Sequence, residues 1–234
     1  MTMSAVLFDM DGTLVDSEPT HYDALVEAVL RHGQAVPDGF ADRITGMSIA
    51  DCHAALVKSI GLSLPLEDFV VAKHLAYLAL APGLKRRAGV DVALDLLARL
   101  NLSYAIVSNS DRMIADANLR ATGLSRPGLV TVTRNDVRHG KPDPEPYLRA
   151  AHLLGVRALD CVVIEDSPVG ARAGLAAGMQ VIAWPEPHRD DLVFPAGCLS
   201  ADPFDLTAAL SRLSTPRTIN IASEPLRGDH HVSR

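Results

Sequence analysis

The chain has 234 residues, of which 48% are hydrophobic and 21% are charged. This composition is ordinary for a soluble globular protein that is long enough to form one large domain or two modest ones. The formal net charge of −6 argues against nucleic acid as the main partner, and no apolar run approaches the roughly 20 residues that a membrane-spanning helix needs.

The cysteines and the N-terminal residues indicate a reducing compartment. Cys52, Cys161 and Cys198 are widely spaced and form no CxxC pair, so they are predicted to be buried small hydrophobic residues and not a disulfide or zinc framework. Because the acidic Asp9 follows only a short apolar stretch, we expect no secretory signal. The protein is therefore expected to be cytoplasmic, as a monomer or a weak oligomer.

Apolar runs and helical patterns alternate along most of the chain. Five runs rich in β-branched residues predict buried strands at residues 5–8, 104–107, 129–132, 161–164 and 180–183. Between most of them lie segments with helical period, at residues 92–100, 114–122, 146–154 and 170–177. Strands that alternate with helices predict an α/β fold with a doubly wound, mainly parallel, Rossmann-like sheet.

The interval between the first and second predicted strands breaks this alternation. It contains helical patterns at residues 21–30, 49–60 and 66–80 and no convincing strand. We therefore predict a catalytic core formed by residues 1–15 and 86–213, and a small helical domain inserted at residues 16–85. The basic segment 85–87 at the second linker is predicted to be solvated, and residues 214–234 are predicted to form a flexible tail.

Two carboxylates follow the first predicted strand directly. Asp9 and Asp11 stand at the exit of the apolar run 5–8, where ionised groups are costly unless a positive charge lies beside them. A hard divalent cation held by carboxylate oxygens would supply that charge and would suit phosphate chemistry. The alternative is that the two residues only shape the turn before Gly12.

Polar groups of a matching kind follow three later strands. Ligands of open α/β sheets bind at the carboxyl ends of the strands, and these ends carry Ser108 with Asn109, Lys141, and Glu165 with Asp166. Taken singly, these residues have structural explanations as a helix N-cap, a surface lysine and a turn. Their coincidence at one edge of a sheet favours a site that binds a phosphate group and a metal ion.

The motifs are similar to those of the haloacid dehalogenase-like phosphohydrolases. Residues 9–18, DMDGTLVDSE, resemble the DxDGTLxDSE signature of that family. Residues 107–110, VSNS, residues 140–144, GKPDP, and residues 165–170, EDSPVG, resemble its later motifs, and the likeness runs from about residue 4 to about 212. The inserted helices resemble the cap of the subgroup that includes β-phosphoglucomutase and many sugar-phosphate phosphatases.

This resemblance implies a role for each motif residue. Asp9 would attack phosphorus and form an aspartyl-phosphate. Asp11 would serve as the general acid and base, for which a raised pKa is expected. The cation, Mg²⁺, would be held by the side chains of Asp9 and Asp166 and the backbone carbonyl of Asp11, with Glu165 as a further ligand or as a partner of the ligands. The remaining phosphoryl oxygens would be bound by Ser108, Asn109 and Lys141.

The cap residues bear on the choice of substrate. Candidate contacts are His21, Arg43, Gly46 and Lys73, and a small phosphorylated metabolite, such as a sugar phosphate, is the expected substrate. His21 lies twelve residues after Asp9, as does a functional histidine of the β-phosphoglucomutases, so a phosphomutase is the alternative. Those mutases carry an arginine three residues after a cap glycine, where this chain has Ile49.

Two other classes of function fit the motifs less well. A dehalogenase would use the position of Asp9 but would need neither an acid at Asp11 nor a metal ion. A protein that only binds phosphate on this scaffold would be expected to have lost a motif residue, and none is missing. The expected function is therefore a Mg²⁺-dependent phosphatase, with the identity of its substrate left open by the sequence.

Overall fold

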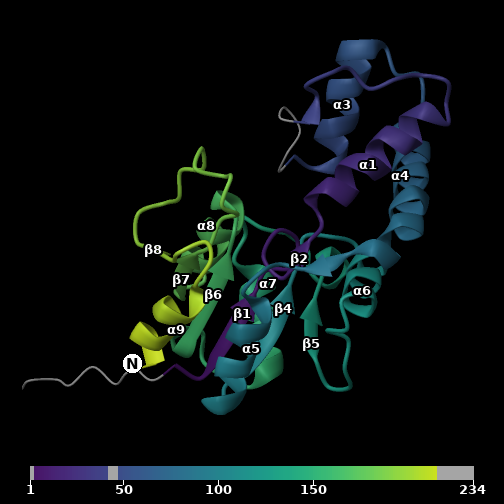
Figure 1. Ribbon diagram of the computed structural model, residues 1–234. Coiled ribbons are helices and arrows are strands. Elements are labelled where there is room, and N and C mark those ends of the chain that lie inside the picture. Colours follow the sequence, from purple (N-terminus) through teal and green to yellow (C-terminus); the bar gives the residue numbers. More distant parts are fainter. Residues whose placement is uncertain (1–2, 42–46, 215–234) are drawn as a thin grey trace, which may run out of the picture.

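The computed structural model describes residues 3–41 and 47–214, and its centre is a six-stranded parallel sheet (Figure 1). The strands lie in the order β5-β4-β1-β6-β7-β8. Their bounds are β1 Ala5–Phe8, β4 Ser103–Val107, β5 Val130–Val132, β6 Cys161–Glu165, β7 Gln180–Ala183 and β8 Leu199–Ser200. The five predicted strands are confirmed, and β8 is an additional edge strand.

Helices cover both faces of this sheet, which explains why its strands are apolar throughout. Successive side chains of a strand point to opposite faces. Val6 and Phe8 accordingly pack in a cluster with α5 (Val90–Arg99), α6 (Arg112–Ala121) and α9 (Leu206–Ser214). Ala5 and Leu7 pack in a second cluster with α7 (Glu145–Leu154) and α8 (Pro168–Ala176). The predicted doubly wound α/β fold is confirmed.

The described part of the predicted insertion is helical. It contains α1 (Glu18–Leu30), α3 (Ile49–Ile60) and α4 (Leu66–Leu80), followed by the short 3-10 helix η1 (Ala81–Gly83). Figure 1 shows α1, α3 and α4 grouped together to one side of the sheet. They share a hydrophobic cluster of their own, in which Leu25, Phe40, Leu56 and Phe69 are buried.

A short antiparallel ribbon connects these helices to the sheet. It consists of β2 (Val15–Asp16) and β3 (Lys85–Arg86), which pair with each other. The predicted boundaries at residues 15/16 and 85/86 fall within this ribbon. The division into two domains at those points stays a prediction.

The expectation that the whole segment 85–87 is solvated is wrong for Arg87. Lys85 is exposed, whereas Arg87 is only 7% exposed. The Arg87 guanidinium donates hydrogen bonds to the backbone carbonyls of Gly12 (3.0 Å), Trp184 (2.5 Å) and Pro185 (2.5 Å), and it lies 3.9 Å from the centre of the Trp184 ring. Arg87 therefore ties the second linker to the turn that follows Asp9.

The C-terminal boundary of the predicted core falls in the last turn of α9, which ends at Ser214. The rest of the predicted tail, residues 215–234, lies outside the described residues. None of the helices in the described ranges has the length and apolar character needed to cross a bilayer. The cytoplasmic location, the oligomeric state and the exclusion of nucleic acid stay predictions.

Candidate active site

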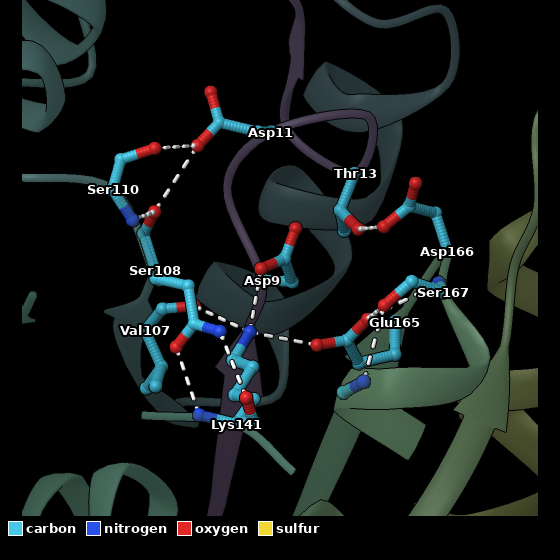
Figure 2. A network of polar contacts seen from close by, with 12 residues as sticks. Asp9, Asp11, Thr13, Val107, Ser108, Ser110, Lys141, Glu165, Asp166 and Ser167 are labelled. Atoms are coloured by element: carbon cyan, nitrogen blue, oxygen red, sulfur yellow. Dashed lines mark hydrogen bonds and ion pairs between the residues drawn. The ribbon is translucent and has the colours of Figure 1, made fainter. Parts of the chain in front are cut away.

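The predicted motif residues come together at the carboxyl edge of the sheet (Figure 2). Because β1 pairs with both β4 and β6, the segments that leave these three strands are neighbours. Hydrogen bonds and ion pairs connect them across the edge. The group contains Asp9 and Asp11 after β1, Ser108 and Ser110 after β4, Lys141 beyond β5, and Glu165 and Asp166 at the end of β6.

Lys141 lies at the centre of this group and is almost completely buried. Its Nζ donates to Oδ1 of Asp9 (2.5 Å), Oε1 of Glu165 (2.7 Å) and the carbonyl of Val107 (2.8 Å). Burial alone would lower the pKa of Lys141, but the charges of Asp9 and Glu165 outweigh it and raise the pKa above its usual value. Lys141 is therefore an ammonium ion throughout the physiological pH range.

Three carboxylates lie close together here, and two of them, Asp9 and Glu165, contact the Lys141 ammonium. Atoms of Asp9, Glu165 and Asp166 lie within 4.8 Å of one another. Burial raises the pKa of Asp9 and that of Asp166, and the negative charges of the neighbouring carboxylates add to the increase. Thr13 donates to Oδ1 of Asp166 (3.1 Å). Within the described residues no donor is recorded for the second oxygen of Asp9 or of Asp166, so both remain available to a cation.

Glu165 differs from the other two carboxylates because its oxygens already have donors. Oε1 accepts from Lys141 and from the hydroxyl of Tyr147 (2.7 Å). Oε2 accepts from the backbone N–H (3.2 Å) and the hydroxyl (2.9 Å) of Ser167. Of the two roles expected for Glu165, these contacts favour the one in which it positions Lys141 and the loop after β6.

Asp11 points away from Asp9, toward Ser108 and Ser110 (Figure 2). Its carboxylate accepts hydrogen bonds from four side chains, namely Ser17 (2.8 Å), Ser108 (3.1 Å), Ser110 (2.8 Å) and Asn118 (2.9 Å), and it lies 3.4 Å from Nε2 of His21. Of these residues Ser17, Ser110 and Asn118 were not expected at the site. Asn118 is 107 residues away along the chain and carries no local motif that could have identified it.

These contacts overturn the expected pKa of Asp11. Burial would raise the pKa of this carboxyl, but the hydrogen bond and the charge of His21, with the hydrogen bonds from Ser17 and Ser110, lower it to about 2. In this conformation Asp11 is ionised at neutral pH. The expectation of a raised pKa is wrong here, because it considered only the neighbouring carboxylate and not the donors on other segments.

Asn109 lies beside Lys141, but its side chain has a structural partner. Its Oδ1 accepts from the backbone N–H of Lys141 (2.8 Å), and its Nδ2 donates to the carbonyl of the same residue (3.0 Å). This pair of hydrogen bonds fixes the loop that carries Lys141. A phosphate contact by Asn109 would therefore come from its backbone N–H.

Comparisons with known proteins identify the family of this chain. The family model for haloacid dehalogenase-like hydrolases matches residues 3–178. The chain belongs to this family. The predicted family and enzyme class are confirmed, and the match covers the segments that carry Asp9, Ser108, Lys141 and Asp166.

Relatives of this hydrolase include phosphatases. The chain is 34% identical to hexitol phosphatase A of Escherichia coli over 78% of its own length and 83% of that protein. It is 33% identical to a phosphoglycolate phosphatase of Cupriavidus necator over 76% of its own length and 79% of that protein. The crystal structure of a haloacid dehalogenase family hydrolase from Deinococcus radiodurans with bound phosphate and sodium has a TM-score of 0.64 and 32% identity, and the match covers 92% of this chain and 89% of that one.

Asp9, Asp11, Ser108 and Lys141 line a cleft of about 1320 Å³ that the inserted helices also line. His21 and Lys73 both line it, as expected. The His21 ring lies 4.3 Å from the ring of Tyr77, and its Nδ1 lies 3.4 Å from Nζ of Lys73. The other two predicted cap contacts, Arg43 and Gly46, lie outside the described residues.

Proposed function

We propose that this hydrolase is a Mg²⁺-dependent phosphatase that acts on a small phosphorylated sugar or polyol, and that the phosphoryl group is carried transiently on Asp9. The observation that carries the proposal is that Asp9 and Lys141, both buried, line an open cleft, with the carboxylate of Asp166 within 4.8 Å of that of Asp9. The similarity to hexitol phosphatase A supports a phosphate monoester as the substrate.

The side chains of Asp9 and Asp166 would hold the metal ion, together with the backbone carbonyl of Asp11. Both carboxylates are hard oxygen donors, and each has one oxygen without a recorded donor in the described residues, which fits Mg²⁺. A bound Mg²⁺ supplies positive charge that offsets the repulsion between the Asp9 carboxylate and the phosphoryl oxygens. At about 4 Å this repulsion is roughly 4 kcal/mol at an effective dielectric constant near 20.

Asp9 is the proposed nucleophile because it lies at the end of β1 with one oxygen held by Lys141. An Asp9 oxygen would form a bond to phosphorus while the bond between phosphorus and the leaving oxygen breaks. Lys141 would stabilise the ionised form of Asp9 and, with Ser108 and the backbone N–H of Asn109, the charge on the phosphoryl oxygens. Water would then attack phosphorus, restoring Asp9 and releasing phosphate.

Asp11 is the proposed general acid and base. It would give a proton to the leaving oxygen and later take one from the attacking water. The described conformation does not serve this role, since five neighbouring side chains hold Asp11 ionised and turned away from Asp9. In this proposal catalysis requires that Asp11 leaves Ser108 and Ser110 and turns toward Asp9.

A β-phosphoglucomutase activity is the second candidate. The contact between His21 and Asp11 (3.4 Å) favours it, because it places a cap histidine beside the proposed acid. Ile49 opposes it, since an apolar side chain lines the cleft where the mutases carry an arginine.

The test is phosphate release from a panel of sugar and polyol phosphates with and without Mg²⁺. Wild-type enzyme should release phosphate only with the metal, and Asp9→Asn should abolish turnover with an unchanged circular dichroism spectrum. The control is Asp23→Asn, which removes the same charge from the exposed side of α1. Near-normal turnover by Asp9→Asn would exclude Asp9 as the nucleophile, and conversion of β-glucose 1-phosphate to glucose 6-phosphate without phosphate release would establish the mutase instead.

A further inference from the structure

Four carboxylates line the part of the cleft between the start of α1 and the loop after β7. They come from β2, α1 and that loop, and we call them the acidic rim: Asp16, Glu18, Glu186 and Asp191. They line the same cleft as Asp9 and Lys141, so the leaving group of a phosphate ester bound there would share the cleft with them. None of them has a part in the proposed chemistry.

The positive side chains of the same loop offset this charge only in part. The guanidinium of Arg189 forms two hydrogen bonds with Asp191, at 2.9 and 3.2 Å. Nε2 of His188 lies 3.5 Å from the carboxylate of Glu186 and is positive only when protonated. Glu18 and Glu186 therefore keep an excess of negative charge on this wall.

Apart from Lys141 and that loop, two further lysine or arginine side chains of the described ranges line the cleft, and both already have partners. Nζ of Lys73 lies 3.4 Å from Nδ1 of His21, and burial lowers the pKa of Lys73. Arg134 donates to the carbonyl of Val137 at 3.0 Å. A second anionic group on a substrate would have to compete with these partners for Lys73 and Arg134.

Glu18 is the rim residue whose carboxylate is best placed to bind a group of the substrate. Its side chain is half-buried and lines the cleft, and no donor to its carboxylate is recorded among the described residues. Burial raises the pKa of Glu18, as do the charges of Asp11 and Glu186, while the positive charges of His21 and Arg189 lower it in part. A partly buried carboxylate without a protein donor is stabilised by a hydroxyl or ammonium group and destabilised by another anion.

We propose that Glu18 and Glu186 are specificity-determining residues that select leaving groups without an anionic group of their own. Monophosphates of neutral polyols and sugars would be accepted, and substrates with a second phosphate or a carboxylate would be rejected. This inference rests on the proposed phosphatase function. It predicts that the enzyme resembles a hexitol phosphatase more than a phosphoglycolate phosphatase in its choice of substrate.

Sorbitol 6-phosphate and 6-phosphogluconate form a matched pair for the test, because they share a carbon chain and differ at C1, where one has a hydroxymethyl group and the other a carboxylate. For wild-type enzyme with Mg²⁺, kcat/KM for 6-phosphogluconate should be lower by about tenfold or more, since a like charge several ångströms away opposes binding. Glu18→Gln and Glu186→Gln should each reduce the ratio of kcat/KM for sorbitol 6-phosphate to kcat/KM for 6-phosphogluconate, mainly by lowering KM for 6-phosphogluconate. Higher ionic strength should also reduce it, and the control Asp23→Asn should not.

Equal kcat/KM values for the two substrates in wild-type enzyme would overturn the inference, and so would a ratio that neither Gln variant changes. Hydrolysis of an aryl phosphate with turnover of neither sugar derivative would also overturn it, while leaving the phosphatase intact. Failure to release phosphate from the aryl phosphate as well would instead contradict the proposed function.

Discussion

Replacing Arg87 by Met removes a buried guanidinium and keeps a side chain that can still pack on Trp184. The guanidinium donates to the carbonyls of Gly12, Trp184 and Pro185. A buried carbonyl that loses its donor costs about 1–3 kcal/mol, and the cation–π contact adds about 1 kcal/mol. Burying the positive charge of Arg87 costs free energy in the wild type, and the variant avoids this cost, which offsets part of its loss in stability. We expect the free energy of unfolding to fall by about 3 kcal/mol.

Equilibrium unfolding in urea measures this loss, with Lys85→Met as the control. Lys85 lies two residues earlier and is exposed, so its replacement should change the free energy of unfolding by no more than about 0.5 kcal/mol. Arg87→Met should also lower kcat, because the Gly12 carbonyl belongs to the turn that carries Asp9 and Asp11. A loss below about 1 kcal/mol for Arg87→Met would refute the idea that its three hydrogen bonds fasten the linker to this turn.

Three further changes test other contacts of the site. The pKa of Asp11 is lowered from 3.8 to about 2, so ionised Asp11 stabilises the fold above about pH 4, and this contribution disappears as the pH falls toward 2. In urea titrations over that range, the free energy of unfolding of wild type should fall by about 2 kcal/mol more than that of Asp11→Asn. Equal decreases in the two proteins would contradict the lowered pKa. Gly170→Ala would place a Cβ 1.6 Å from Oε1 of Glu165, so it should lower the free energy of unfolding by about 2 kcal/mol or more. The control Gly83→Ala should change it little, because Gly83 has open space around it. An unchanged stability of Gly170→Ala would show that Glu165 is free to move. Mg²⁺ at about 100 times its Kd should stabilise wild type by about 2.7 kcal/mol and raise Tm by about 5–10 °C, and a rise of the same size in Asp166→Asn would exclude Asp166 as a ligand.

The elements with a strong local period could be predicted from the sequence. The predicted helices at residues 49–60 and 66–80 coincide with α3 and α4, because apolar spacing and the turns beside them mark both ends. The strands that carry the motifs were predicted for a similar reason, since burial on both faces makes each of them a continuous apolar run. The convergence of Asp9, Lys141 and Asp166 followed from topology, because parallel strands end at the same edge of a sheet.

The missed features depend on contacts between distant segments. The strands β2, β3 and β8 have two residues each, too few for a period. The burial of Arg87 depends on carbonyls about a hundred residues further along the chain, at Trp184 and Pro185. The hydrogen bond from Asn118 to Asp11 likewise joins distant segments, and no sequence pattern marks Asn118, which is buried within α6.

The most direct test of the central claim is to locate the phosphoryl group during turnover. The enzyme is mixed with Mg²⁺ and sorbitol 6-phosphate and quenched in acid. Borohydride then reduces any phosphorylated aspartate to homoserine, and peptide mass spectrometry locates the homoserine in the sequence. The account predicts homoserine at position 9 and at no other aspartate, and none in Asp9→Asn. Phosphate release without any modification of Asp9, or homoserine at position 11 or 166, would contradict it.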